Sequence, residues 1–87
     1  MKRTKVELDS ELAAVRAEHW KMAKEMLRLS SEETRLFARV QPGPEFETCL
    51  DAWLANKRAG GKVYIRYGEL MIAEAGILAE AKLLAKE

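Results

Sequence analysis

The feature that most constrains this chain is a repeat of mainly apolar residues near its beginning. The spacing alternates between four and three residues through Leu8, Leu12, Val15, His19, Met22, Met26 and Leu29. This alternation is typical of helices that pack along their whole length, where it marks the a and d positions of a seven-residue repeat. It predicts a helix over about 5–29 that packs lengthwise against another helix.

A second apolar stripe runs beside the first one. Its members are Ala13, Trp20, Ala23 and Leu27. At 100° per residue the two stripes together cover about 200° of the helix, whereas about 100° is enough for a helix on the surface of a core. The first helix is therefore expected to contact more than one neighbour.

Three groups of turn-forming residues divide the rest of the chain: Ser30-Ser31, Pro42-Gly43-Pro44 and Gly60-Gly61. Serine followed by glutamate three residues later can form a capping box, and each proline disfavours helix in the residue before it. We therefore predict further helices over about 31–40, 44–59 and 62–86. One continuous helix over 5–40 is the alternative, because two serines weaken a helix without ending it.

Residues 62–67 are ambiguous. Val63, Ile65 and Tyr67 occupy alternate positions, which is a strand pattern, but no second strand is available to pair with them. We interpret this segment as the start of the last helix, or as a lead-in that ends at Gly68.

The last segment is apolar on nearly every side. Leu70, Ile77 and Leu84 recur every seven residues, and Met71 and Leu78 recur beside them. A helix of this kind is either central to a fold or shared between chains. We predict an all-α fold, a small antiparallel bundle of three or four helices forming one domain over 1–87. It is expected to assemble as a homodimer or higher oligomer, with a compact monomer as the alternative.

Composition excludes several classes of protein. The chain is 48% hydrophobic, which is too apolar for disorder, and its net charge of +1 gives no overall attraction to nucleic acid or membranes. No apolar run approaches the roughly 20 residues that span a bilayer, and no signal peptide is recognisable at the N-terminus. We expect a cytoplasmic protein without a membrane partner.

Catalysis has only weak candidates in this sequence. His19 and Cys49 are the sole residues of their types, so a thiolate–imidazole pair is conceivable. However, Cys49 shares the apolar side of its predicted helix with Phe46 and Trp53, where cysteine usually serves as a small hydrophobic residue. We expect no catalytic residue, no metal site and no cofactor, and therefore not an enzyme.

The excess of apolar surface suggests a function in binding. Small helical proteins without catalytic groups are commonly adaptors, inhibitors or antiactivators, so we predict a protein–protein interaction module that acts as a homo-oligomer on an unidentified protein partner. The residues assigned to its partner or oligomer interface are Trp20, Leu27, Leu70, Met71, Ile77, Leu78 and Leu84.

A basic segment supports an alternative function. Lys57, Arg58, Lys62 and Arg66 occur with no acidic residue between 57 and 66, and Tyr64 and Tyr67 lie close by. Cations next to aromatic rings can hold a phosphate backbone. The alternative is a small nucleic-acid-binding regulator, and the simpler interpretation is that these cations cap helices and face water.

Part of the second half resembles one known family. Gly60-Gly61, Ile65-Arg66-Tyr67, Glu69 and Ile72 are similar to the last helix of the TraM quorum-sensing antiactivators. That resemblance implies a small all-helical dimer. It covers about a quarter of the chain, Pro42-Gly43-Pro44 has no counterpart in it, and it carries over no functional residue.

Overall fold

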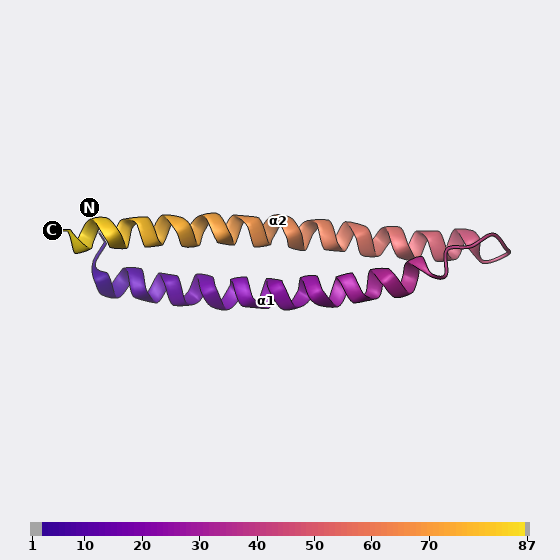
Figure 1. Ribbon diagram of the computed structural model, residues 1–87, viewed down its shortest axis with the longest axis horizontal. Coiled ribbons are helices and arrows are strands. Elements are labelled where there is room, and N and C mark those ends of the chain that lie inside the picture. Colours follow the sequence, from indigo (N-terminus) through magenta and orange to yellow (C-terminus); the bar gives the residue numbers. More distant parts are fainter. Residues whose placement is uncertain (1–2, 87) are drawn as a thin grey trace.

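The chain folds as a hairpin of two long antiparallel helices in a computed structural model, shown in Figure 1. Helix α1 spans Lys5–Phe37 and helix α2 spans Phe46–Ala85. The structure describes residues 3–86. Its Cα atoms extend over 67 × 16 × 15 Å, so the molecule is a rod that is one helix pair thick.

The expected bundle of three or four helices is wrong. The helices predicted over 5–29 and 31–40 are one helix, and those predicted over 44–59 and 62–86 are also one helix. Glycine in a helix interior costs about 1 kcal/mol relative to alanine, which packing on both sides of Gly60-Gly61 outweighs. At the serine pair the helical ladder likewise continues, and the hydroxyl of Thr34 donates to the carbonyl of Ser30 at 3.3 Å.

Other expectations about the backbone are confirmed. The fold is all-α, and the alternative of a continuous helix through Ser30-Ser31 is correct, although it ends at Phe37. Residues 62–67 are helical. The chain reverses through Pro42-Gly43-Pro44, where Gly43 has a φ of +152° that residues with a Cβ rarely adopt.

Helix α1 begins at a capping box that the sequence analysis did not identify. The amide of Glu7 donates to the hydroxyl oxygen of Thr4 at 3.2 Å, and the Glu7 carboxylate accepts from the Thr4 amide. These bonds satisfy amide groups that the first turn of a helix leaves without partners.

One line of contacts, which we call the seam, joins the two helices. On α1 the predicted repeat from Leu8 to Leu29 continues through Glu33 and Leu36. On α2 the same alternation of four and three residues produces the second half of the seam. Its members are Cys49, Trp53, Asn56, Gly60, Val63, Tyr67, Leu70, Glu74, Ile77, Ala81 and Leu84. The hairpin is therefore a two-stranded antiparallel coiled coil.

The register of the seam is consistent from end to end. Near the loop, the rings of Phe37 and Trp53 lie 5.5 Å apart, and Nδ2 of Asn56 donates to the carbonyl of Leu29 at 3.1 Å. At the open end, Nε of Arg3 donates to the carboxylate of Glu80 at 3.0 Å.

Glycine substitutions test this backbone. Gly76 lies inside α2, and a Cβ built there meets no atom within 4 Å. We expect Gly76→Ala to raise stability by about 1 kcal/mol, which corresponds to roughly 4–8 °C in the Tm of a domain of this size. Thermal unfolding followed by circular dichroism measures the shift.

The matched change Gly43→Ala is expected to lower the Tm because of the positive φ in the loop. A drop in Tm for Gly76→Ala would contradict the conclusion that α2 is continuous at Gly76 and that no other part of the chain packs against this position.

Candidate interaction face

Five large exposed apolar side chains of the two helices project toward one side of the hairpin. Trp20 and Leu27 each follow a seam residue of α1 by one position, and Tyr64, Met71 and Leu78 each follow a seam residue of α2 by one position. Each residue of an α-helix is rotated by about 100° about the helix axis from the residue before it. Because α1 and α2 run in opposite directions and face each other, the residues that follow seam positions lie on the same side of the hairpin in both helices. We call these five residues the apolar face.

The members of the apolar face are uncovered to an unusual degree for residues of their size. Trp20 is 65% exposed, Leu27 71% and Met71 51%. Ile65 and Ile72 continue the apolar surface around the outer side of α2 and are also exposed. Apolar residues scattered singly on a surface need no explanation, but a contiguous set marks an interface.

The opposite side of the hairpin is charged. On α1, Glu11, Glu18, Glu25 and Glu32 each precede a seam residue by one position. The guanidinium of Arg66 on α2 donates to both carboxylate oxygens of Glu18, at 2.8 and 2.9 Å. These hydrogen bonds lower the pKa of Glu18 and raise that of Arg66. This side of the rod therefore carries a row of ion-paired glutamates, whereas the apolar face carries exposed apolar side chains.

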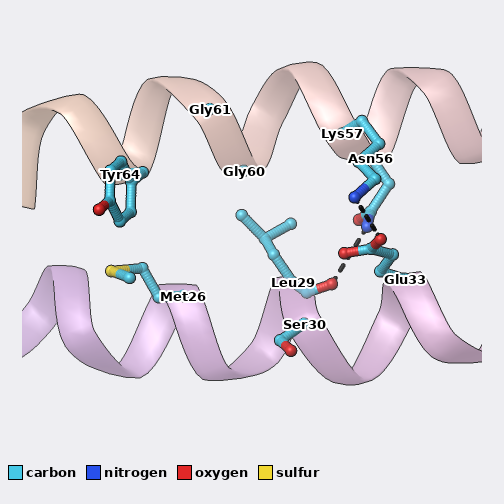
Figure 2. A pocket seen from close by; sticks show the side chains of 9 residues that line it. All are labelled: Met26, Leu29, Ser30, Glu33, Asn56, Lys57, Gly60, Gly61 and Tyr64. Atoms are coloured by element: carbon cyan, nitrogen blue, oxygen red, sulfur yellow. Dashed lines mark hydrogen bonds and ion pairs between the residues drawn. The ribbon is translucent and has the colours of Figure 1, made fainter.

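A cleft of about 330 Å³ opens between the helices where Gly60 lies in the seam. Figure 2 shows the Leu29 side chain pointing toward Gly60, with Met26 and Tyr64 facing each other across the gap. A second hollow of about 400 Å³ is lined by Ala23, Met26, Leu27, Ser30 and Tyr67. Hollows beside exposed apolar side chains are what a helix of another chain needs to pack its own side chains.

The structure divides the seven predicted interface residues into two groups. Trp20, Leu27, Met71 and Leu78 lie on the apolar face. Leu70 and Ile77 are each only 3% exposed, because they pack in the seam against α1 of the same chain, and Leu84 is a half-buried seam residue.

Tyr64 belongs to the apolar face but was not among those seven residues. Sequence reasoning grouped it with the basic segment, although Tyr64, Met71 and Leu78 recur every seven residues and could have revealed the stripe.

The four basic residues do not form one patch. Lys57 follows seam residue Asn56 by one position and pairs with Glu33, whereas Arg66 precedes a seam residue and pairs with Glu18 on the opposite side. Arg58 and Lys62 are exposed and form no ion pair with another residue of the 3–86 stretch.

His19 takes part in a polar layer within the seam. Its Nδ1 lies 3.1 Å from one carboxylate oxygen of Glu74, and Nε of Arg16 donates to the other at 3.0 Å. The ring of Tyr67 packs edge-on against His19 with centroids 4.5 Å apart. The hydrogen bonds from Arg16 and then from His19 lower the pKa of Glu74.

Cys49 lies far from that layer, because it precedes Tyr67 by 18 residues along α2, which is about 27 Å at 1.5 Å per residue. A thiolate–imidazole pair within one chain is therefore not formed in this structure.

Two other kinds of site are absent from the part of the chain that the structure describes. No group of three or more acidic, histidine or cysteine side chains is placed to hold a metal ion among residues 3–86. Neither α1 nor α2 contains a stretch that is long and apolar enough to cross a membrane.

No family model, no curated protein and no solved structure matches this chain. The resemblance of residues 60–72 to the antiactivators is thus without support from a match. Function has to be inferred from the geometry of the chain itself.

The polar layer generates a prediction about pH. The pKa of Glu74 is lowered in the folded state, so the stability that its ionised form contributes is fully present above the ordinary value of 4.5 and is lost as the pH falls below it. We expect Glu74→Gln to lower the Tm at pH 7 and to weaken the fall in Tm between pH 5 and about pH 3.

Glu69→Gln is the control, because Glu69 is 59% exposed and lies outside the seam. If the Tm depends on pH in the same way in the wild type and in Glu74→Gln, the polar layer does not stabilise the hairpin.

Proposed function

We propose that this protein is a non-enzymatic protein–protein interaction module that binds apolar helical surfaces through the apolar face and acts as a homo-oligomer. The observation that carries the proposal is the set of five exposed apolar side chains on one side of the hairpin, opposite a row of four ion-paired glutamates of α1. The partner's surface would present apolar side chains at helical spacing.

The exposed area of the hairpin supports this proposal. The single chain exposes 6835 Å², whereas a compact monomer of 9.9 kDa exposes about 5,200 Å². The excess of about 1,600 Å² is larger than the roughly 800 Å² that each partner contributes to a standard stable interface. Each large apolar side chain removed from water contributes about 1.5–3 kcal/mol, so a few residues of the apolar face suffice for stable association.

Nucleic-acid binding through the basic segment stays a prediction, and no feature of the structure favours it. Lys57 and Arg66 already neutralise glutamates of α1, and Arg58 and Lys62 are the two of the four cations that form no ion pair within residues 3–86. Two phosphate contacts give only weak, salt-sensitive binding.

Association can be tested by placing a charge on the apolar face. We expect the wild-type chain to have a mass above 9.9 kDa in multi-angle light scattering at micromolar concentrations, and Leu27→Glu to shift it toward the monomer. The reason is that Leu27 is exposed in one chain, so a glutamate there is harmless to the hairpin but is desolvated when a partner covers it.

Ala14→Glu is the matched control. Ala14 is an exposed residue of the same helix that precedes seam residue Val15, so it lies on the charged side, and the substitution changes net charge by the same amount. A monomeric wild type at these concentrations, or equal dissociation by both variants, would overturn the proposal.

A further inference from the structure

The side of the hairpin that carries the apolar face presents two rows of residues on each helix. The far row lies about 130° from the seam around the helix axis, and the near row about 75° from it. In the middle of α1 the far row is large and the near row is small: Trp20 and Leu27, then Ala23 and Ser30. In the middle of α2 the far row is small and the near row is large: Gly61, Gly68 and Ala75, then Tyr64, Met71 and Leu78. Large residues of one helix therefore occupy the positions that small residues occupy in the other.

Contacts in the seam show which residues of α1 and α2 lie at the same height along the rod. The rings of His19 and Tyr67 pack against each other with centroids 4.5 Å apart. Trp20 and Gly68 follow these two residues by one position each, so they lie at the same height to within about 3 Å. They are not in contact within one chain, because no side chain of α1 lies within 4 Å of a Cβ built on Gly68.

Leu27 and Gly61 have the same relation. The Leu29 side chain points toward Gly60 in Figure 2, Leu27 precedes Leu29 by two positions, and Gly61 follows Gly60 by one. Leu27 and Gly61 are therefore also level. A Cβ built on Gly61 likewise meets no atom within 4 Å. Each large residue in the far row of α1 thus has, at its own height on α2, a glycine that the rest of the chain leaves open.

We infer that a second copy of this chain covers the apolar face with its loop at the same end of the rod, so that α1 of each copy packs against α2 of the other. This inference rests on the proposed function, because it specifies the partner and its orientation in that assembly. A two-fold axis parallel to the rod leaves every residue at its own height. Trp20 of each copy then lies against Gly68 of the other, and Leu27 lies against Gly61, so both helices of each apolar face are covered.

The two rows favour this orientation over the reverse one. With the loops at the same end, far rows meet far rows and near rows meet near rows, so large residues of one helix lie over small residues of the other in both. With the loops at opposite ends, α1 would pack against α1 and α2 against α2. Large residues would then meet large residues in the far rows of α1, and glycines would meet glycines in the far rows of α2, which leaves voids.

The charges on this side of the hairpin suit the same orientation. Within residues 3–86, four charged residues follow a seam residue by one position: Asp9, Arg16, Lys57 and Lys82. Arg16 and Lys57 are already paired with seam glutamates of their own chain, whereas Asp9 and Lys82 form no ion pair within that stretch. Asp9 and Lys82 follow two residues that line one hollow at the open end, Leu8 and Ala81. With the loops at the same end, Asp9 of each copy therefore meets Lys82 of the other, and the opposite charges attract.

The outer flanks of this pairing bring no like charges together in the middle of the rod. By the same comparison of heights, Lys24 of one copy is level with Ile65 of the other, and Arg58 is level with Ser31. Both cations therefore face uncharged residues.

The distance between the two loops tests the orientation directly. Gln41 is an exposed loop residue, so a nitroxide label on a Gln41→Cys, Cys49→Ser variant reports the separation of the loops in double electron–electron resonance. Loops at the same end are expected to give about 20–30 Å, because little more than one helix diameter and the two label linkers separate them. Loops at opposite ends of a 67 Å rod would give more than about 60 Å.

A bulky side chain at Gly68 tests the inferred contact. Gly68→Leu leaves the hairpin intact, since a Cβ there meets no atom within 4 Å, but it fills the space that Trp20 of the other copy would occupy. We expect it to weaken self-association by about tenfold or more in sedimentation equilibrium. Gly76→Leu is the matched control, because Gly76 is equally open but precedes seam residue Ile77 and lies on the charged side. It should not weaken association, and circular dichroism checks the helical content of both variants.

A second substitution shows which residue meets Gly68. Trp20→Ala removes the side chain with which Gly68→Leu collides, so the double variant should associate no more weakly than Gly68→Leu alone. Leu27→Ala combined with Gly68→Leu is the control, and its two effects should multiply, because Leu27 lies about 10 Å farther along α1.

The outcomes separate this inference from the proposed function. If the wild type associates and Leu27→Glu dissociates it, but the loops are far apart or Gly68→Leu acts no more strongly than Gly76→Leu, the orientation is wrong and the proposed function stands. A wild type that stays monomeric would overturn both. Loops close together, with non-additive effects for Trp20 and Gly68 but not for Leu27 and Gly68, support both.

Discussion

The hairpin is held together by the single seam between α1 and α2, because two helices that pack side by side share only one line of contacts. Each helix buries one narrow strip against the other, so among residues 3–86 only Leu8, Leu29, Leu70 and Ile77 are 7% exposed or less. The remaining sides of both helices stay in water unless another chain covers them. An elongated two-helix rod thus leaves more surface available for binding than a compact monomer of the same mass.

The distribution of charge decides which of those sides is available. Among the glutamates that precede seam residues, Glu18 is joined across the seam by Arg66, and Glu25 and Glu32 pair with Arg28 and Arg35 of the same helix. These carboxylates are therefore paired within one chain. The apolar face has no comparable partners, and hollows beside Gly60 and Leu27 break its surface. The two sides of the rod therefore differ in how many exposed apolar side chains they carry, which favours binding through the apolar face.

The sequence was informative about pattern and poor at predicting helix length. The repeat from Leu8 to Leu29 correctly indicated lengthwise packing, and Pro42-Gly43-Pro44 correctly located the chain reversal. Gly60-Gly61 was read as a helix end because local propensity was weighed without the seam. Asn56, Gly60 and Glu74 obscured the seam of α2, since none of them is apolar, yet they occupy its positions.

For the same reason, only part of the apolar face could be predicted from the sequence. Without the register of α2, Leu70 and Ile77 could not be distinguished from Met71 and Leu78, although one residue of rotation separates a buried position from an exposed one. Trp20 and Leu27 could be predicted, because the repeat in α1 is regular enough to show which apolar residues lie outside it.

The exposure of Trp20 is the most direct measure of whether the apolar face is covered in solution. In a Trp53→Phe variant, Trp20 is the only tryptophan, and its emission and its quenching by acrylamide report on its contact with water. Assembly through the apolar face predicts a shift of emission to shorter wavelength and a several-fold loss of quenching as protein concentration rises from nanomolar to micromolar. A Trp20 that remains equally quenched across that range would contradict the account.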